Sequence, residues 1–404
     1  MNQGDFKKGF PGKLVPTQLT EYLDGPMEKP VQTKTFAFVP DPLPPKIDWR
    51  SLQLEHFETY SATLLALGKI NGLHKRVGNA AGMLRTLWMR EAKLSSEVEN
   101  IHTTAEELVL AGAGRSLHPR DSSLESWNYV RALEHGIHSD LPWSSRLIRE
   151  MHDILLQSVR GKTHRPGLFR DKGVYLSGPL PGARHARFIP MPQGDSLLDA
   201  IRDLEIFVNN SHEHIPPLFA VAITHYQFET IHPFSDGNGR IGRVLISRSL
   251  VKEKLLEHPV VYMSAYINEH RKQYVDLLLK ISQEGGQAWS NWIGFFLEAI
   301  RTQTLDAIWR SEELINLQVK FQDLLKTDGA PPRLFPVVDT LFASPAINIA
   351  DLMKQTQTTK TTAGKDIDRL ERLEILREVT GRERERDWLA QKIVDIISKE
   401  SPQL

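Results

Sequence analysis

The segment HPFSDGNGRIGR at residues 232–243 constrains the fold more than any other feature, because it places glycines between two helix-forming runs. Before it, a proline pair precedes the apolar run LFAVAITHYQF, which predicts a buried helix. After it, Ile241 and Val244 recur at helical spacing, so we expect a second helix to begin near Asn238 or Gly239. The segment is therefore predicted to be a loop between two helices.

The composition of this loop is typical of an anion-binding site. Gly237 and Gly239 allow backbone N–H groups to converge in a concave turn, where the positive end of the following helix also lies. Arg240 and Arg243 are three residues apart, so their planar donor groups can reach the same anion.

Two further side chains of the loop suit phosphate chemistry. Asp236 offers a hard oxygen ligand for a Mg²⁺ ion that bridges phosphates. His232 titrates near neutrality, which suits a general base. Taken singly, GNGR could be a type I′ turn and the histidine a structural residue. Their combination favours a base, a metal ligand and a polyphosphate cradle.

The whole chain limits the remaining classes of function. Its 404 residues are enough for two or three domains, and its 50 Lys plus Arg equal its 50 Asp plus Glu, so no global charge attracts nucleic acid or anionic membranes. The absence of cysteine excludes disulfides and thiolate sites. The N-terminus has no apolar core and no apolar run approaches 18 residues. We expect a soluble, cytoplasmic protein that does not span a membrane.

Most of the chain shows helical patterns. Residues 1–50, rich in proline and turn formers, are expected to be irregular. Two short strands around a Pro/Gly turn are predicted between 172 and 190, from Val174, Leu176, Phe188 and Ile189. Helices are expected at about 52–110, 123–138, 145–158, 195–210 and 217–231, and from 240 to about 326.

The C-terminal residues 334–404 are predicted to form a small module after the linker TDGAPPR at 327–333. INIADLMKQTQ and KTTAGKDIDRLERLEIL indicate two helices joined by a turn, and LREVTGRERERDWLA indicates a two-stranded wing, as in a winged helix. Acidic and basic residues are nearly equal in number here, whereas DNA-binding modules normally carry a basic surface. A packing or partner-binding role and DNA binding both remain open.

The loop also resembles a known motif. HPFSDGNGRIGR matches the Fic motif, HxFx[D/E]GNGRxxR, at every defined position. The resemblance implies a mainly α fold, namely a Fic helical core with a short β-hairpin flap, plus a C-terminal winged-helix domain. It also implies a protein adenylyltransferase, which moves AMP from ATP to a hydroxyl side chain of a target protein.

The resemblance assigns a role to each residue of the motif. His232 would deprotonate the target hydroxyl, Asp236 would hold Mg²⁺ between the α- and β-phosphates, and Phe234 would anchor the loop in the core. The nucleotide would be bound by Gly237, Asn238, Gly239, Arg240 and Arg243.

Segments outside the motif resemble one Fic subgroup. They suggest an N-terminal part at 1–110 with an inhibitory motif, a catalytic core at 111–326 and the winged-helix-like domain at 334–404. SSEVEN matches the inhibitory pattern [S/T]xxxE[G/N] through Ser95, Glu99 and Asn100. Ser95 and Glu99 are four residues apart, so we expect them on one helix face, from which Glu99 would pair with Arg243 in place of the γ-phosphate. The alternative is an ordinary helix end capped by Asn100.

Two further regions have weaker assignments. The hairpin at 172–190 corresponds to the Fic flap, which holds the target segment as an added strand, although it could be an ordinary surface hairpin. Tyr274 stands where Fic proteins contact adenine, and Tyr266 could line the same pocket, but both could be core aromatics. HEH at 212–214 favours a loop over a metal site.

Three functions follow from the sequence. The first is an adenylyltransferase that modifies a target and possibly itself, using ATP and Mg²⁺ and inhibited by Glu99. The second is a hydrolase that removes AMP from a modified protein, with Glu99 positioning water. The third is a regulator that acts through the winged helix. The target, a homodimer and DNA binding are left open.

Overall fold

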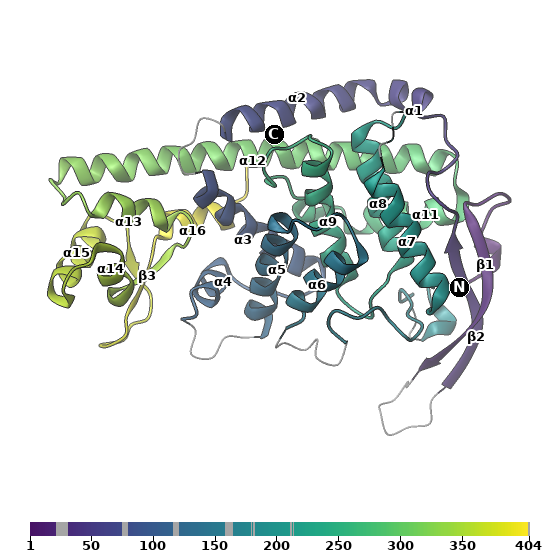
Figure 1. Cartoon of the computed structure of the whole chain (residues 1–404), viewed down its shortest axis with the longest axis horizontal. Coiled ribbons are helices and arrows are strands. Elements are labelled where there is room, and N and C mark those ends of the chain that lie inside the picture. Colours follow the sequence, from purple (N-terminus) through teal and green to yellow (C-terminus); the bar gives the residue numbers. More distant parts are fainter. Residues whose placement is uncertain are drawn as a thin grey trace. The chain divides into compact units, whose positions relative to one another are not determined.

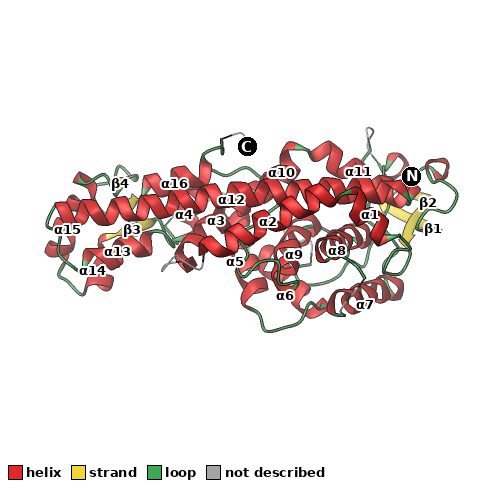
Figure 2. Cartoon of the chain, turned by 90° about the horizontal axis from the view of Figure 1, so that it is seen from above, coloured by secondary structure: helices red, strands yellow, loops and turns green. Residues whose placement is uncertain are grey.

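The computed structural model describes residues 1–21, 31–74, 80–115, 121–157, 165–178, 180, 182–210, 212 and 214–402. Figure 2 shows that helices dominate these residues and that strands are few, as the sequence predicted. The chain divides into two compact units, each assembled from three separate stretches. The first contains residues 1–63, 131–255 and 269–300, and the second contains 64–130, 256–268 and 301–404. The boundaries at 110, 326 and 334 inferred from the sequence stay a prediction.

The N-terminal residues correct one expectation. Instead of being irregular, they form the antiparallel strands β1 (Gly12–Glu21) and β2 (Val31–Pro40), paired from Gly12 with Pro40 to Glu21 with Val31. At the start of β2, Val31, Thr33 and Thr35 alternate with Gln32 and Lys34, which suits a pleated surface. The prolines that suggested an irregular segment lie mostly after β2, and Pro16 is tolerated because each strand of a two-stranded sheet is an edge.

The first unit is built around α8 (Pro217–Ile231), which packs beside α9 (Asn238–Lys252) (Figure 1). Almost every residue of α8 is buried, as its apolar sequence predicted. The helix α9 begins at Asn238, in agreement with the sequence. The other helices with residues in this unit are α1 (Trp49–Glu55), α2 (Phe57–His74), α5 (Asp121–His138), α6 (Ser145–Leu155), α7 (Asp195–Asn209), α11 (Arg271–Glu284), α12 (Gln287–Thr327) and the short 3-10 helices η1 (Gln3–Asp5) and η3 (Ala183–His185).

The second unit combines the C-terminal module with helices from earlier in the chain. Its core joins Met83 of α3 (Ala80–Val98) to apolar residues of α12 and of the module, and the Thr86 hydroxyl donates to the Phe342 carbonyl over 2.6 Å. Arg115, after α4 (Ala105–Gly112), pairs with Asp387 over 2.7 Å. The short α10 (Ser264–Glu269) contributes most of its residues here. The helix α3 thus shares a core with the C-terminal module.

The C-terminal module contains the predicted pair of helices and the predicted two-stranded wing. A short strand that the sequence did not indicate, β3, pairs with β5, so that the sheet has the order β3-β5-β4. The elements are α13 (Leu334–Leu341), β3 (Ala346–Asn348), α14 (Ile349–Thr356), α15 (Lys360–Arg372), β4 (Arg377–Glu378), β5 (Asp387–Leu389) and α16 (Gln391–Ser398). The winged-helix assignment of this module stays a prediction. In the described part of the chain, no helix is long and apolar enough to cross a bilayer.

Candidate active site

His232 lies where α8 ends. It adopts a left-handed conformation, with φ 52°, and its N–H donates to the Phe228 carbonyl over 2.9 Å. Its Nδ1 is 3.2 Å from the Glu229 carbonyl oxygen, which can only accept, so Nδ1 carries the proton of the neutral ring. The Nε2 atom is then the basic nitrogen. The fold of the helix end therefore sets the tautomer that a general base needs.

The loop after His232 is closed by its own residues. The Asn238 side chain accepts from the Phe234 N–H and donates to the Phe234 carbonyl, both over 2.9 Å. Phe234 is fully buried and Asn238 is nearly so. The amide of Asn238 is thus used to shape the loop, and its predicted contact with nucleotide falls to its backbone N–H.

The start of α9 has the features of an anion site. Its N-cap, Gly237, has φ 78° and supplies no side-chain cap. The first regular helical bond runs from the Ile241 N–H to the Gly237 carbonyl, so the first turn of α9 lies before the regular i→i−4 ladder. A Cβ on Gly237 would lie 3.2 Å from Leu155 Cδ2, and a positive φ already disfavours any other residue. A helix N-terminus without a side-chain cap is a favourable place for an anion.

Charged groups surround this helix end. One oxygen of Asp236 accepts from the Gly237 N–H over 2.7 Å, and the other lies 3.5 Å from the Arg240 guanidinium. The Asp236 side chain is 46% exposed, whereas Arg240 and Arg243 of α9 are almost fully buried. Mg²⁺ commonly takes one or two protein carboxylates and completes its shell with phosphates and water. A single exposed carboxylate beside an anion site fits such a Mg²⁺–nucleotide.

The sequence did not identify His152 as part of the site. This buried residue of α6 lies parallel to the Phe234 ring, with centroids 3.7 Å apart. Its Nδ1 accepts from the Gly167 N–H, so its Nε2–H donates to the Asp236 carbonyl, both over 3.0 Å. His152 therefore supports the loop through this ring contact and this hydrogen bond. Nothing in the sequence around it distinguishes it from other helical histidines.

Arg170 was also missed. It is 3% exposed, and its Nε donates to the carbonyl of His232 over 2.7 Å. In RPGLFRDKG it resembles a surface arginine, because neighbouring residues are charged or turn-forming. Only the tertiary structure brings it to the catalytic loop.

The predicted hairpin at 172–190 is smaller than expected. Leu176 and Phe188 form a single antiparallel bridge, in which the Leu176 N–H donates to the Phe188 carbonyl over 2.8 Å. The Phe38 N–H of β2 donates to the Ile189 carbonyl over 2.9 Å. The prediction of two strands was thus right about the paired residues and wrong about their extent. Pro179 and Pro181, at the tip, lie outside the described residues.

Glu21 at the end of β1 holds this region. Its carboxylate accepts from the Ala183 N–H over 2.7 Å. The Tyr175 hydroxyl also donates to Glu21, and this hydrogen bond, together with some burial and the nearby negative charge, raises the pKa of Tyr175 to about 12. Leu19 and Ala37 of the N-terminal hairpin pack with Ala183 in one apolar cluster. The N-terminal hairpin is therefore the support of the predicted flap.

Comparison with known proteins identifies the family. The sequence model described as "Fic/DOC family" matches residues 142–250, and the one described as "Fic/DOC family N-terminal" matches residues 58–138. The first range contains the whole loop at 232–243 and the whole flap region at 172–190.

The chain belongs to the Fic family.

Relatives with curated names share only part of their length with this chain. The protein adenylyltransferase Fic of Aedes aegypti is 29% identical over 167 residues, which are 41% of this chain and 30% of that protein. Its namesake in Drosophila melanogaster is 32% identical over 120 residues, 30% of this chain and 21% of that protein. The matches thus span less than a third of each relative.

A solved structure shows the same fold over a longer stretch. A crystal structure of a Fic family protein from Desulfovibrio desulfuricans G20 matches with a TM-score of 0.51 and 20% identity. The match covers 82% of this chain and 95% of that one. The Fic helical fold therefore extends over most of the chain.

The two tyrosines that are predicted to contact adenine differ in their surroundings. Tyr274 of α11 is 7% exposed, and its hydroxyl lies 2.8 Å from His225 Nε2. Burial, and then the positive charge of Arg243, lowers the pKa of His225 to about 3, so this histidine is neutral. Tyr266 lies on α10 and is partly buried. The adenine contacts of both residues stay a prediction.

The inhibitory motif lies at the end of α3. Ser95 is buried in the helix, whereas Glu99 is exposed and directly follows Val98, the last helical residue. Asn100 has φ 59°, the left-handed conformation that ends many helices. Glu99 thus lies in a turn and not on the helix face that we expected. Its pairing with Arg243 stays a prediction.

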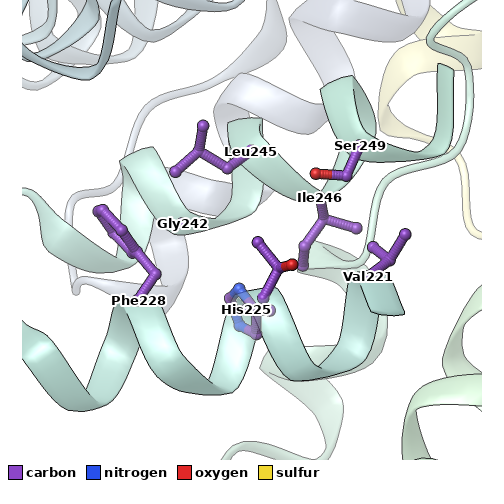
Figure 3. Close-up of a pocket in the computed structure, with 8 residues that line it drawn as sticks. Val221, His225, Phe228, Gly242, Leu245, Ile246 and Ser249 are labelled. Atoms are coloured by element: carbon purple, nitrogen blue, oxygen red, sulfur yellow. The ribbon is translucent and has the colours of Figure 1, made fainter. Parts of the chain in front are cut away.

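A narrow pocket separates α8 from α9, and Figure 3 shows His225 on α8 facing Gly242 on α9. A Cβ on Gly242 would approach Glu229 Oε1 to 2.2 Å, so this glycine permits the close packing of the two helices. The pocket is lined mainly by apolar side chains and holds none of the charged motif residues. It is a feature of helix packing, separate from the anion site.

The HEH segment is described only in part. His212 Nε2 donates to the Phe207 carbonyl over 2.6 Å, and its ring stacks on Phe207 with centroids 4.2 Å apart. These contacts fit the loop interpretation. Glu213 lies outside the described residues.

Proposed function

We propose that this Fic protein is an adenylyltransferase, which transfers AMP from ATP to a hydroxyl side chain of a target protein. One observation carries the proposal. The basic Nε2 of His232 and the uncapped N-terminus of α9 stand at the two ends of a single short loop. A base for the nucleophile and an anion site for the nucleotide are the two parts that phosphoryl-type transfer requires. The curated names of the relatives support the same reaction.

The reaction balances with these groups. The target hydroxyl oxygen attacks the α-phosphorus of ATP, and its proton passes to His232 Nε2. The bond between the α-phosphorus and the bridging oxygen breaks, and diphosphate leaves. The Glu229 carbonyl, as acceptor from Nδ1–H, orients the ring and stabilises the imidazolium that forms.

The nucleotide phosphates would be bound by the backbone N–H groups at the start of α9 and by Arg240 and Arg243. Asp236 would hold Mg²⁺, which when bound supplies positive charge to the phosphates. Asp236 is itself oriented through its bond from Gly237 and through the His152 contact to its carbonyl. The target segment would dock on the flap at 172–190.

We further infer that Glu99 restrains the enzyme by occupying Arg243, which would otherwise receive the γ-phosphate. Removing the carboxylate should then improve the orientation of the α-phosphate. A misplacement of about 1 Å can cost on the order of 10²-fold in rate, so Glu99→Gly should raise self-modification by about that factor.

The test uses labelled ATP and four proteins: wild type, Glu99→Gly, Glu99→Gly with His232→Ala, and Glu97→Gly. The last is a matched control, because Glu97 lies two residues away, in the last turn of α3, and pairs with Lys93 over 2.6 Å. We expect a gain for Glu99→Gly alone, and none when His232 is also removed. No transfer by any protein would refute the adenylyltransferase. A loss of AMP release from an AMP-modified protein would instead make Glu99 a hydrolytic residue.

Three arginines in or next to the C-terminal module are already paired with carboxylates. Arg369 and Arg372 pair with Asp328 over 3.2 and 3.0 Å, and Arg333 pairs with Asp366 over 2.9 Å. A cation engaged with a carboxylate is a weak site for phosphate, since the acid repels it. We therefore assign this module to packing and regulation. A gel shift that weakens with salt would contradict this assignment.

A further inference from the structure

Arg170 joins the catalytic loop to both ends of the flap. Its guanidinium donates to the carbonyls of His232 over 2.7 Å and Ile231 over 3.3 Å, at the end of α8. It also donates to the Lys172 carbonyl over 3.3 Å and the Met191 carbonyl over 2.5 Å. Lys172 is the first residue of the flap region, and Met191 directly follows its last. One side chain thus bonds three segments of the chain.

The backbone of Arg170 strengthens this junction, because its N–H donates to the Pro233 carbonyl over 2.9 Å. Pro233 follows His232, so Arg170 contacts three consecutive residues from Ile231 to Pro233. The left-handed conformation of His232 is unfavourable for a residue with a Cβ and must be held by its surroundings. A cation at a helix C-terminus is also electrostatically favourable.

Burying the charged Arg170 side chain costs free energy. Capping of helix α8 alone does not explain why this residue is buried. Its side-chain hydrogen bonds to the described residues all go to main-chain carbonyls, and none to a carboxylate. Burial lowers its pKa to about 10, which leaves it charged at neutral pH. Buried cations are normally paired with an anion. An exposed lysine or arginine would cap the end of α8 without this desolvation.

We propose that Arg170 is a positioning residue, which fixes His232 relative to both ends of the flap so that a docked hydroxyl meets Nε2. The planar guanidinium suits this role, because its five donors can serve several carbonyls in fixed directions. The inference rests on the proposed AMP transfer. It adds a residue that touches neither the nucleotide nor the target.

The test compares Arg170→Met, Arg170→Lys and Arg165→Met, each combined with Glu99→Gly to raise self-modification. Methionine keeps much of the length of arginine but donates no hydrogen bond. Arg165 is the matched control, because it lies on the same segment and pairs only at the surface with Asp171. Hydrogen exchange is followed at 172–178, 187–191 and 228–234, and ATP affinity is measured separately.

We expect Arg170→Met to speed exchange in all three segments and to slow self-modification about 10²-fold, the order of loss from a misplaced reacting group. ATP affinity should change by less than about threefold, because the anion site does not use Arg170. Arg170→Lys keeps the charge but cannot bond four carbonyls, so its rate should be intermediate. Arg165→Met should resemble its parent.

Two results would overturn the proposal. If Arg170→Met speeds exchange only at 228–234, Arg170 acts only as a helix cap. If its self-modification stays within about threefold of the parent, Arg170 has no role in the reaction. If Arg170→Met does not fold, the rate and exchange of Arg170→Lys decide in the same way. A parent that transfers no AMP would refute the proposed function, while the exchange pattern would still decide whether Arg170 joins the three segments.

Discussion

The catalytic loop and the flap lie in the same compact unit but are held in different ways. In the loop, most bonds join residues a few positions apart, as between Asn238 and Phe234, or His232 and Glu229. In the flap, one bridge joins its two arms, and the remaining support comes from residues far away in the chain, such as Glu21 and Phe38. The loop is built locally, whereas the flap is built by tertiary contacts.

The loop carries the proposed chemistry, and the flap carries the proposed docking of the target protein. The base and the anion site need fixed geometry whichever protein is modified, and short-range bonds provide it at a small entropic cost. A docking strand gains affinity from main-chain bonds and specificity from its surroundings. We infer that the loop tolerates few changes and that the flap can be altered through the N-terminal hairpin without changing the chemistry.

The largest effect is expected from breaking the local closure of the loop. Asn238→Ala leaves the buried N–H and carbonyl of Phe234 without their partner, at a cost of about 1–3 kcal/mol each. The loop should shift, and AMP transfer should fall about 10²-fold or more. Transfer is measured with labelled ATP in the Glu99→Gly background.

The control for this prediction is Asn209→Ala. It removes side-chain bonds to the Trp143 and Glu205 carbonyls at the end of α7, outside the loop. The temperature of thermal unfolding should fall in both variants, but AMP transfer should fall only in Asn238→Ala. Equal transfer by the two variants would show that the loop does not depend on its own closure.

A smaller effect is expected from releasing the flap. Glu21→Ala loses the bonds from the Ala183 N–H and the Tyr175 hydroxyl, each worth about 0.5–1.5 kcal/mol. Self-modification should fall about 3- to 10-fold, with ATP affinity unchanged. Glu21→Gln keeps an acceptor and should recover most of the rate.

Glu284→Ala is the control, because Glu284 also forms a contact near the N-terminus, with Lys7 over 2.9 Å. Hydrogen exchange at 182–189 should rise in Glu21→Ala and not in Glu284→Ala. A flap that exchanges equally in both would contradict the supporting role of the N-terminal hairpin.

The smallest effect concerns pH. The pKa of His225 falls from 6.5 to about 3 on folding, so the unfolded chain binds more protons between these values and stability is lost as pH falls through this range. If the unfolded chain binds one proton more than the folded chain, the free energy of unfolding should drop by about 2 kcal/mol from pH 6.5 to pH 5. Tyr175 has the opposite sign, because its raised pKa makes the flap lose stability as pH rises from 10 to about 12.

Unfolding by denaturant, measured at several pH values, tests the opposite pH dependences expected from His225 and Tyr175. The acid-side slope should be shallower in His225→Gln, and the alkaline loss should be smaller in Tyr175→Phe, where the raised pKa values of buried Tyr226 and Tyr262 still contribute. If His225→Gln keeps the slope of the wild type, the neutral histidine between α8 and α9 is not the origin of the acid sensitivity. His74→Gln is a parallel control, since burial also lowers the pKa of His74, to about 4.

Local patterns predicted local structure well. The glycines and the spacing of Ile241 and Val244 placed the start of α9 near residue 238, where the structure has it. The helices and the wing of the C-terminal module were found from periodicity and turn residues. The N-terminal strands were missed because proline-rich neighbours outweighed a short alternation at the start of β2. Glu99 was assigned to a helix face, although α3 ends at Val98 and Glu99 lies in the turn that leads to the left-handed Asn100.

The sequence by itself was enough to predict the chemical centre, because the histidine, the acid, the glycines and the two arginines lie within twelve residues. Only the tertiary structure decided what surrounds that centre. His152 and Arg170 are separated from the loop by about 60 to 85 residues, and their hydrogen bonds to backbone carbonyls require only that a donor be present at the right place. A backbone carbonyl carries no side-chain identity, so such bonds leave no pattern in the sequence.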